Sequence, residues 1–131
     1  MSLQQEVFRA CISLAEQMHL PLVVHAVKCT EELFRIHKEL KPQMPWIIHG
    51  FRGRKEVAEQ YLKRGFYLSF GEHFHDEALR STPLERLLLE TDESRLSMEE
   101  ICRKAASVYG LPAEILAARI TSNAQKVLFL Q

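Results

Sequence analysis

Cysteine, net charge and long apolar runs are all scarce in this 131-residue sequence, and each shortage excludes a class of protein. The three cysteines are odd in number and lack the paired spacing of a disulfide framework or a zinc site, which predicts reduced thiols. Lys+Arg and Asp+Glu both total 17, so no net positive charge draws the chain to nucleic acid or to an anionic membrane. No apolar run approaches the ~20 residues that span a bilayer, and polar residues 4–6 interrupt any signal-like start. We therefore expect a cytoplasmic protein without a membrane partner.

Short apolar runs alternate with amphipathic segments along the whole chain. The apolar runs predict strands near residues 21–25, 46–49, 66–70 and 86–91. Helical patterns cover residues 4–18, 30–40, 54–63 and 76–80, and continue from about residue 97 onward with a break at 110–112. The first helical pattern contains an apolar stripe formed by Val7, Ala10, Cys11, Leu14, Ala15 and Met18.

This alternation of strands and helices predicts a parallel sheet with right-handed crossovers. A complete barrel built in this way takes about 250 residues, so residues 1–131 would form a single domain that is half of one. The expected fold class is therefore α/β, with about four parallel strands and flanking helices. A four-stranded open α/β domain is the structural alternative.

Three polar residues stand at the carboxyl ends of predicted strands. His25 and His49 end the first two apolar runs, and Asp92 follows the fourth. In a parallel α/β sheet these ends line the crevice that binds ligands, so the fold would bring the three side chains together. Two imidazoles and a carboxylate suit a divalent cation. The alternative is that each histidine is a hydrogen-bonded structural residue, and His19 and His37 are expected on helix surfaces away from this end of the sheet.

Four segments of the chain form an ordered series, namely LPLVVH at 20–25, IIHGFRG at 47–53, GFYLSF at 65–70 and LLLETD at 87–92. The series resembles successive motifs of the TatD family of metal-dependent deoxyribonucleases, in the amidohydrolase superfamily. Residues 4–18 resemble the helix before that family's fifth strand, and Asn123-Ala124 with Val127–Phe129 resemble its closing helix. The resemblance covers nearly the whole chain and implies the C-terminal half of a TIM-type (β/α)8 barrel.

The resemblance also implies metal-dependent hydrolysis of phosphodiester bonds, with nucleic acid as the substrate. On that analogy His25, His49 and Asp92 bind a divalent metal (Zn²⁺, Mn²⁺ or Mg²⁺), and Asp92 is also the catalytic residue that accepts a proton from the attacking water. Lys28 and Arg52 would face the substrate phosphate. Glu90 lies two residues before Asp92, on the same side of the strand, and would support a metal ligand from behind.

Part of the family's metal site has no counterpart in this sequence: a His-x-His pair on the first strand and a bridging Glu on the fourth. His73-Phe74-His75 has the spacing of the pair, but it follows the third predicted strand, which favours a solvated loop. A half barrel would also leave two sheet edges and an apolar interior open, so we expect a homodimer or a larger oligomer. The alternative function is a catalytically inactive half barrel that self-associates as a structural or interaction module.

Overall fold

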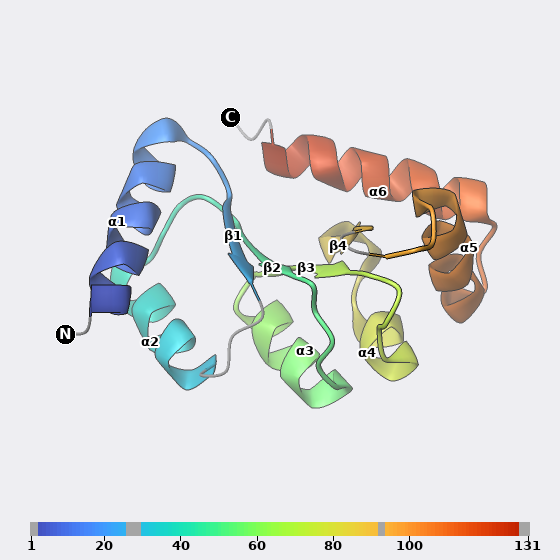
Figure 1. Cartoon of the computed structure of the whole chain (residues 1–131), viewed down its shortest axis with the longest axis horizontal. Helices are drawn as coiled ribbons and strands as arrows, with labels where there is room; N and C mark the ends of the chain where they lie inside the picture. The colour runs from blue at the N-terminus through green and yellow to red at the C-terminus, as the bar shows by residue number, and fades with distance from the viewer. Residues whose placement is uncertain (1–2, 26–29, 92–93, 129–131) are drawn as a thin grey trace.

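The computed structural model describes residues 3–25, 30–91 and 94–128, and Figure 1 shows their arrangement around one curved sheet. The strands are β1 (Leu22–His25), β2 (Trp46–His49), β3 (Tyr67–Phe70) and β4 (Leu87–Leu89). The helices are α1 (Leu3–Met18), α2 (Thr30–Leu40), α3 (Lys55–Lys63), α4 (Asp76–Ser81), α5 (Met98–Tyr109) and α6 (Ala113–Leu128), with a 3-10 turn, η1, at Leu84–Arg86. This alternation confirms the expected α/β fold class.

The four strands form one parallel sheet in the order β1-β2-β3-β4. The predicted strand near 86–91 is shorter at both ends, because Arg86 belongs to the preceding 3-10 turn and the strand itself ends at Leu89. The guanidinium of Arg86 donates a hydrogen bond to the carbonyl of Gly65, at the entry of β3. Arg86 therefore ties the starts of the two neighbouring strands together instead of pairing within the sheet.

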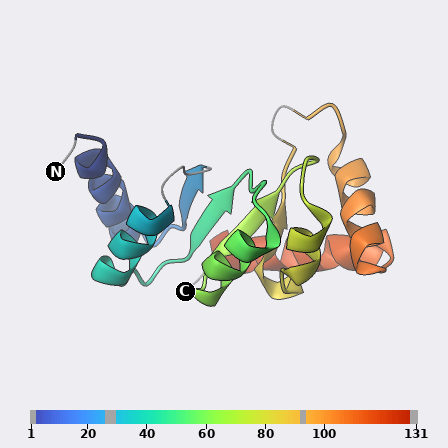
Figure 2. The same cartoon turned by 90° about the horizontal axis from the view of Figure 1, so that it is seen from below.

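One face of the sheet carries the main hydrophobic core. Val24, Ile48, Leu68 and Leu87 lie side by side in the strand register, and all four are buried in one cluster. Figures 1 and 2 show α2, α3 and α4 along the same side of the sheet, with α6 across the opposite side and α5 next to the start of α6. Because side chains alternate between the two faces of a strand, the neighbouring residues, including His25 and His49, point to the other face.

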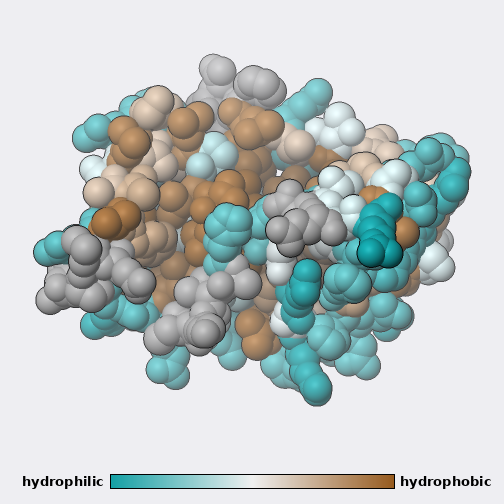
Figure 3. All heavy atoms as spheres, viewed as in Figure 1, coloured by the Kyte–Doolittle hydropathy of each residue, from teal (hydrophilic) through white to brown (hydrophobic). Residues whose placement is uncertain are grey.

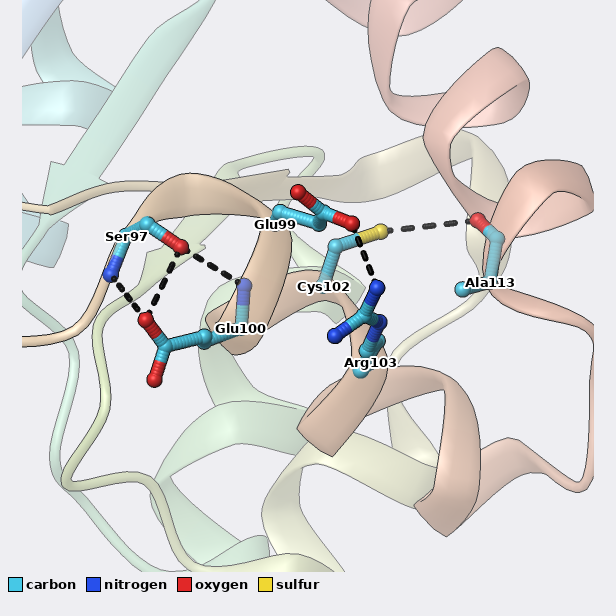
Figure 4. Close-up of polar contacts among 6 residues, drawn as sticks. All are labelled: Ser97, Glu99, Glu100, Cys102, Arg103 and Ala113. Atoms are coloured by element: carbon cyan, nitrogen blue, oxygen red, sulfur yellow. Dashed lines mark hydrogen bonds and ion pairs between the residues drawn. The ribbon is translucent and has the colours of Figure 1, made fainter.

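A capping box fixes the start of α5, close to the residue at which the last helical pattern of the sequence begins. The Ser97 side chain accepts a hydrogen bond from the backbone N–H of Glu100 at 3.1 Å, and the Glu100 carboxylate accepts one from the Ser97 backbone N–H at 3.4 Å (Figure 4). Two backbone donors that a helix start leaves unpaired are thus satisfied. The cap places α5 directly after the chain leaves the carboxyl end of β4.

His37 is not the surface residue that its position on a polar helix suggested. It is half-buried, with ring centroids 4.7 Å from Trp46 and 4.6 Å from Phe66. Burial, and secondarily the positive charge of Arg64, lower the pKa of His37 below its ordinary value of 6.5. The expectation failed because His37 follows Leu33 by four residues and Phe34 by three, which places it on the buried side of α2, against Trp46 and Phe66.

This burial predicts a pH-dependent stability. The unfolded chain binds a proton at His37 more readily than the folded protein, so stability is full above pH 6.5 and falls as the pH drops through that value. His37→Phe retains a ring between Trp46 and Phe66 but cannot titrate. We expect its urea midpoint to fall less than that of the wild type between about pH 7.5 and about pH 5.5. His73→Phe, at an exposed position, is the control and should keep the wild-type pH dependence; equal slopes for all three proteins would contradict the prediction.

Candidate metal centre

His25 and His49 lie next to each other at the carboxyl ends of β1 and β2. The parallel register pairs the two residues directly. Their imidazole rings meet edge to face, with centroids 4.9 Å apart and planes at 76°. The sequence prediction that these strand ends bring the two histidines together is thus confirmed in the structure, and it follows from the shared polarity of neighbouring parallel strands.

Glu90 connects the ends of β2 and β4 across β3. Its Oε2 lies 3.2 Å from Nε2 of His49, and its Oε1 accepts a hydrogen bond of 2.8 Å from the backbone N–H of Gly50. Its own backbone N–H donates to the carbonyl of Phe70 at 3.0 Å. The Glu90 side chain is only 12% exposed, and that of His49 is 22% exposed. The Glu90 carboxylate thus contacts His49 at Nε2 and fixes the orientation of its ring. This agrees with the supporting position expected from its place two residues before Asp92 in the sequence.

The turn after β2 is shaped by two glycines. Gly50 adopts a φ of 66°, in the left-handed region that side chains other than that of glycine rarely occupy. A Cβ at Gly53 would lie 2.7 Å from the ring of Phe51, which is itself buried. This compact turn lets the Gly50 N–H reach Glu90 and leaves Arg52 exposed at its surface.

The remaining predicted site residues fall into two groups. Asp92 and Lys28 lie outside the described residues. His73 and His75 are exposed on either side of the buried Phe74, and Nε2 of His73 is 3.5 Å from a carboxylate oxygen of Glu72, which agrees with a solvated loop.

The sequence did not predict the position of one polar residue near the histidines. Ser69 of β3 is buried on the sheet face that carries His25 and His49. Its neighbours, Leu68 and Phe70, predict the strand, but they lie on its opposite face and gave no sign that Ser69 is buried.

The side chains at these strand ends fit part of a divalent-metal site. Two adjacent imidazoles are suitable ligands, and a carboxylate behind Nε2 of one ring is the support that metal-binding histidines typically have. Within residues 3–25, 30–91 and 94–128, however, no group of three or more His, Cys, Asp or Glu side chains could hold a metal ion. Among the described residues, the candidate site therefore consists of two imidazoles and one carboxylate, and Asp92, the third predicted ligand, lies outside them.

Parallel βα units with ligand-type side chains at their carboxyl ends define this chain as part of a TIM-barrel type of α/β protein. The chain belongs to the TatD family: a family model described as "TatD related DNase" matches residues 1–129. It is 39% identical over 98 residues to "Uncharacterized metal-dependent hydrolase YabD" of Bacillus subtilis (strain 168), a match that covers 69% of this chain and 38% of YabD.

Solved structures agree on the fold. The chain is similar to a hydrolase TatD family protein from Entamoeba histolytica, with a TM-score of 0.83 and 18% identity, covering 98% of this chain and 57% of that one. It is also similar to YJJV, a TatD homologue from Escherichia coli k12, with a TM-score of 0.79 and 20% identity, covering 92% and 54% of the two chains. These neighbours are TIM barrels, which confirms the expected barrel type. The chain thus spans about half the length of the solved relatives and less of YabD. In the part of the chain that the structure describes, no helix has the length and apolar character to cross a membrane.

Proposed function

We propose that this chain carries part of the active site of a metal-dependent hydrolase that cleaves phosphodiester bonds in DNA. The observation that carries the proposal is the pairing of His25 with His49 at the carboxyl ends of β1 and β2, with Glu90 set behind His49. The family description "TatD related DNase" supports a phosphodiester substrate, and YabD's name supports metal dependence. Neither of these names identifies the metal, so Zn²⁺, Mn²⁺ and Mg²⁺ all remain to be compared.

In this proposal the residues at the strand ends bind the metal, accept a proton, orient a ligand or contact the substrate phosphate. His25, His49 and Asp92 would hold a divalent cation, and the cation would supply a lowered pKa for a bound water and a positive charge opposite the phosphate. Asp92 would also be the group that accepts the proton of the attacking water. Glu90 keeps the His49 ring in a fixed orientation through its 3.2 Å contact with Nε2. Arg52, exposed on the turn after β2, and Lys28 contact the substrate phosphate.

A specific observation also favours a second candidate function, a catalytically inactive interaction module. Among the described residues, which do not include Asp92, no group of three or more His, Cys, Asp or Glu side chains could hold a metal ion. A partial barrel of this kind would keep the family's scaffold without its turnover. The compartment we propose for either function is the cytoplasm, which agrees with the unpaired thiols of Cys11 and Cys102.

Metal binding tests the first proposal. We expect isothermal titration with Zn²⁺ and with Mn²⁺ to show binding that His25→Ala and Asp92→Ala each weaken by at least about 10-fold, because each change removes a ligand. Glu90→Gln keeps the size of the side chain but loses its charge, so it should weaken binding by about 10- to 100-fold. His73→Ala, which removes an exposed histidine from another loop, is the matched control and should bind like the wild type.

The outcomes separate the two functions. Binding that the ligand variants abolish, together with metal-dependent cleavage of a DNA oligonucleotide, would support the hydrolase. Absence of binding, or binding that only His73→Ala weakens, would contradict the metal site and leave the interaction module.

A further inference from the structure

Ser69 is a buried polar residue whose hydroxyl is not paired by the fold. The buried polar residues in the described part of the chain are Ser69, Thr82 and Asn123, at 6%, 1% and 1% exposed. The Thr82 hydroxyl donates a hydrogen bond to the carbonyl of Ala78 at 2.9 Å, and the Asn123 amide donates to two backbone carbonyls. Within residues 3–25, 30–91 and 94–128, the Ser69 hydroxyl makes no hydrogen bond. Because an unpaired buried hydroxyl lowers stability, the fold alone does not account for this residue.

The sheet places Ser69 beside the candidate metal centre. Its two strand neighbours pack in the main core, so its own side chain points to the face that carries His49. Ile48 of β2 pairs with Leu68 of β3, and the backbone N–H of Phe51 donates to the carbonyl of Ser69 at 2.9 Å. His49 lies between Ile48 and Phe51 in the chain. It is therefore next to Ser69 where β2 and β3 meet.

Glu90 reaches Ser69 from the other neighbouring strand. Leu88 of β4 is the register partner of Ser69, and Glu90 follows Leu88 by two residues on the same side of the chain. The Glu90 side chain passes Gly71, because a Cβ at Gly71 would lie 3.8 Å from its Cγ. Ser69 is the position two residues before Gly71 and shares its side of the strand. Ser69 therefore borders the contact between Glu90 and His49.

Much of this face of the sheet is apolar. Val23 and Ile47 are register partners on it, and Figure 3 shows apolar side chains gathered over its α1 and β1 part. The nearest carboxylate, that of Glu90, already accepts the backbone N–H of Gly50 and contacts Nε2 of His49. The proton of the Ser69 hydroxyl thus remains to be donated, and an anionic oxygen is the strongest acceptor for it.

We propose that the Ser69 hydroxyl donates a hydrogen bond to an oxygen of the phosphate that binds at the candidate metal centre. This role rests on the proposed function, because phosphodiester hydrolysis brings an anionic phosphate to the strand ends where His25 and His49 lie. A hydroxyl suits a buried position there, since it is less costly to bury than a Lys or Arg side chain and still forms a charge-assisted hydrogen bond. Ser69 would then be a buried substrate contact, in addition to the exposed Arg52.

Two measurements on Ser69→Ala test this role. The midpoint of urea unfolding should equal or exceed that of the wild type, because the change removes a hydroxyl that no described residue pairs. Isothermal titration with inorganic phosphate in the presence of Mg²⁺ should give a dissociation constant at least about 10-fold above the wild-type value, because one charge-assisted hydrogen bond is lost. Titration with Mg²⁺ alone should give the wild-type affinity, since Ser69 is not one of the expected metal ligands.

Thr82→Val is the matched control and should show the opposite pattern. Its hydroxyl is also buried, but it is bonded to Ala78 at the end of α4, before β4 begins. Removing this hydroxyl should lower the midpoint of urea unfolding and leave the phosphate affinity unchanged. Circular dichroism should show that both variants are folded.

Three results would overturn the role of Ser69. A lower unfolding midpoint for Ser69→Ala would mean that the hydroxyl supports the fold. An unchanged phosphate affinity would mean that it binds only water, and a wild-type chain that does not bind phosphate would have no such ligand. A failure of the proposed hydrolysis is distinguishable, because a chain that binds phosphate through Ser69 without cleaving a DNA oligonucleotide would support the role of Ser69 and contradict only the hydrolysis.

Discussion

Phe66→Ala is expected to lower the free energy of unfolding by about 3–5 kcal/mol. Phe66 is fully buried, and its ring lies 5.3 Å from Tyr61, 5.6 Å from Trp46 and 6.0 Å from Phe34, measured between centroids. The residue joins α2, α3 and the start of β3, so removing its ring leaves a cavity that no single element can move to fill. Urea unfolding followed by circular dichroism measures the change.

Phe8→Ala is the matched control for this experiment. Phe8 is only partly buried, and its one ring contact among the described residues is with Trp46, at 5.7 Å. The same loss of a benzyl group should therefore cost clearly less at Phe8. Equal losses at the two positions would mean that the aromatic cluster around Phe66 is not the centre of the core.

The second large effect is expected at Asn123 on α6. The side chain is 1% exposed, and its Nδ2 donates hydrogen bonds to the carbonyls of Leu84 and Leu87, the latter at 2.9 Å. Asn123→Leu keeps a side chain of similar size but leaves both carbonyls without that donor. Because each unpaired buried acceptor costs about 1–3 kcal/mol, we expect a loss of about 2–4 kcal/mol in total. Thermal unfolding by calorimetry measures it.

Gln125→Leu makes the same kind of change two residues further along α6, at an exposed position. It should leave the stability within about 0.5 kcal/mol of the wild type. If Asn123→Leu were equally harmless, the hydrogen bonds that attach α6 to η1 and β4 would not contribute to stability.

Much of the fold follows from local sequence patterns. The predicted helix at 30–40 coincides with α2, and the four strands fall within their predicted ranges apart from the ends of the last one. These elements were predictable because short apolar runs and amphipathic stripes reflect burial directly. His25, His49 and Glu90 were also predictable as neighbours, since the carboxyl ends of parallel strands share one edge of the sheet.

The failures arise where a contact joins distant segments. Arg86 was predicted as part of a strand, but it belongs to a 3-10 turn. Its guanidinium donates a hydrogen bond to the carbonyl of Gly65, 21 residues away. His37 is a polar residue at helical spacing from Leu33 and Phe34, and the positions of Trp46 and Phe66 show that it is half-buried. The apolar stripe of α1 was visible in the sequence, but a periodic pattern does not say which surface covers it. Ser69 shows the same limit, because its neighbours predict a strand without saying what lies over it.

The pairing of His25 with His49 has a consequence for which changes of sequence this end of the sheet tolerates. In β1, Val24 is buried in the core and His25 points to the opposite face, in direct register with His49. Deleting one residue inside this strand would move side chains to the opposite face of the sheet. The imidazole would then face the apolar core, and the valine would face away from it. A change of length inside β1 would therefore disturb both the burial of Val24 and the pairing of His25 with His49, whereas a substitution at position 25 alone leaves the core intact. A point substitution at position 25 should therefore be tolerated better than an insertion or deletion inside β1.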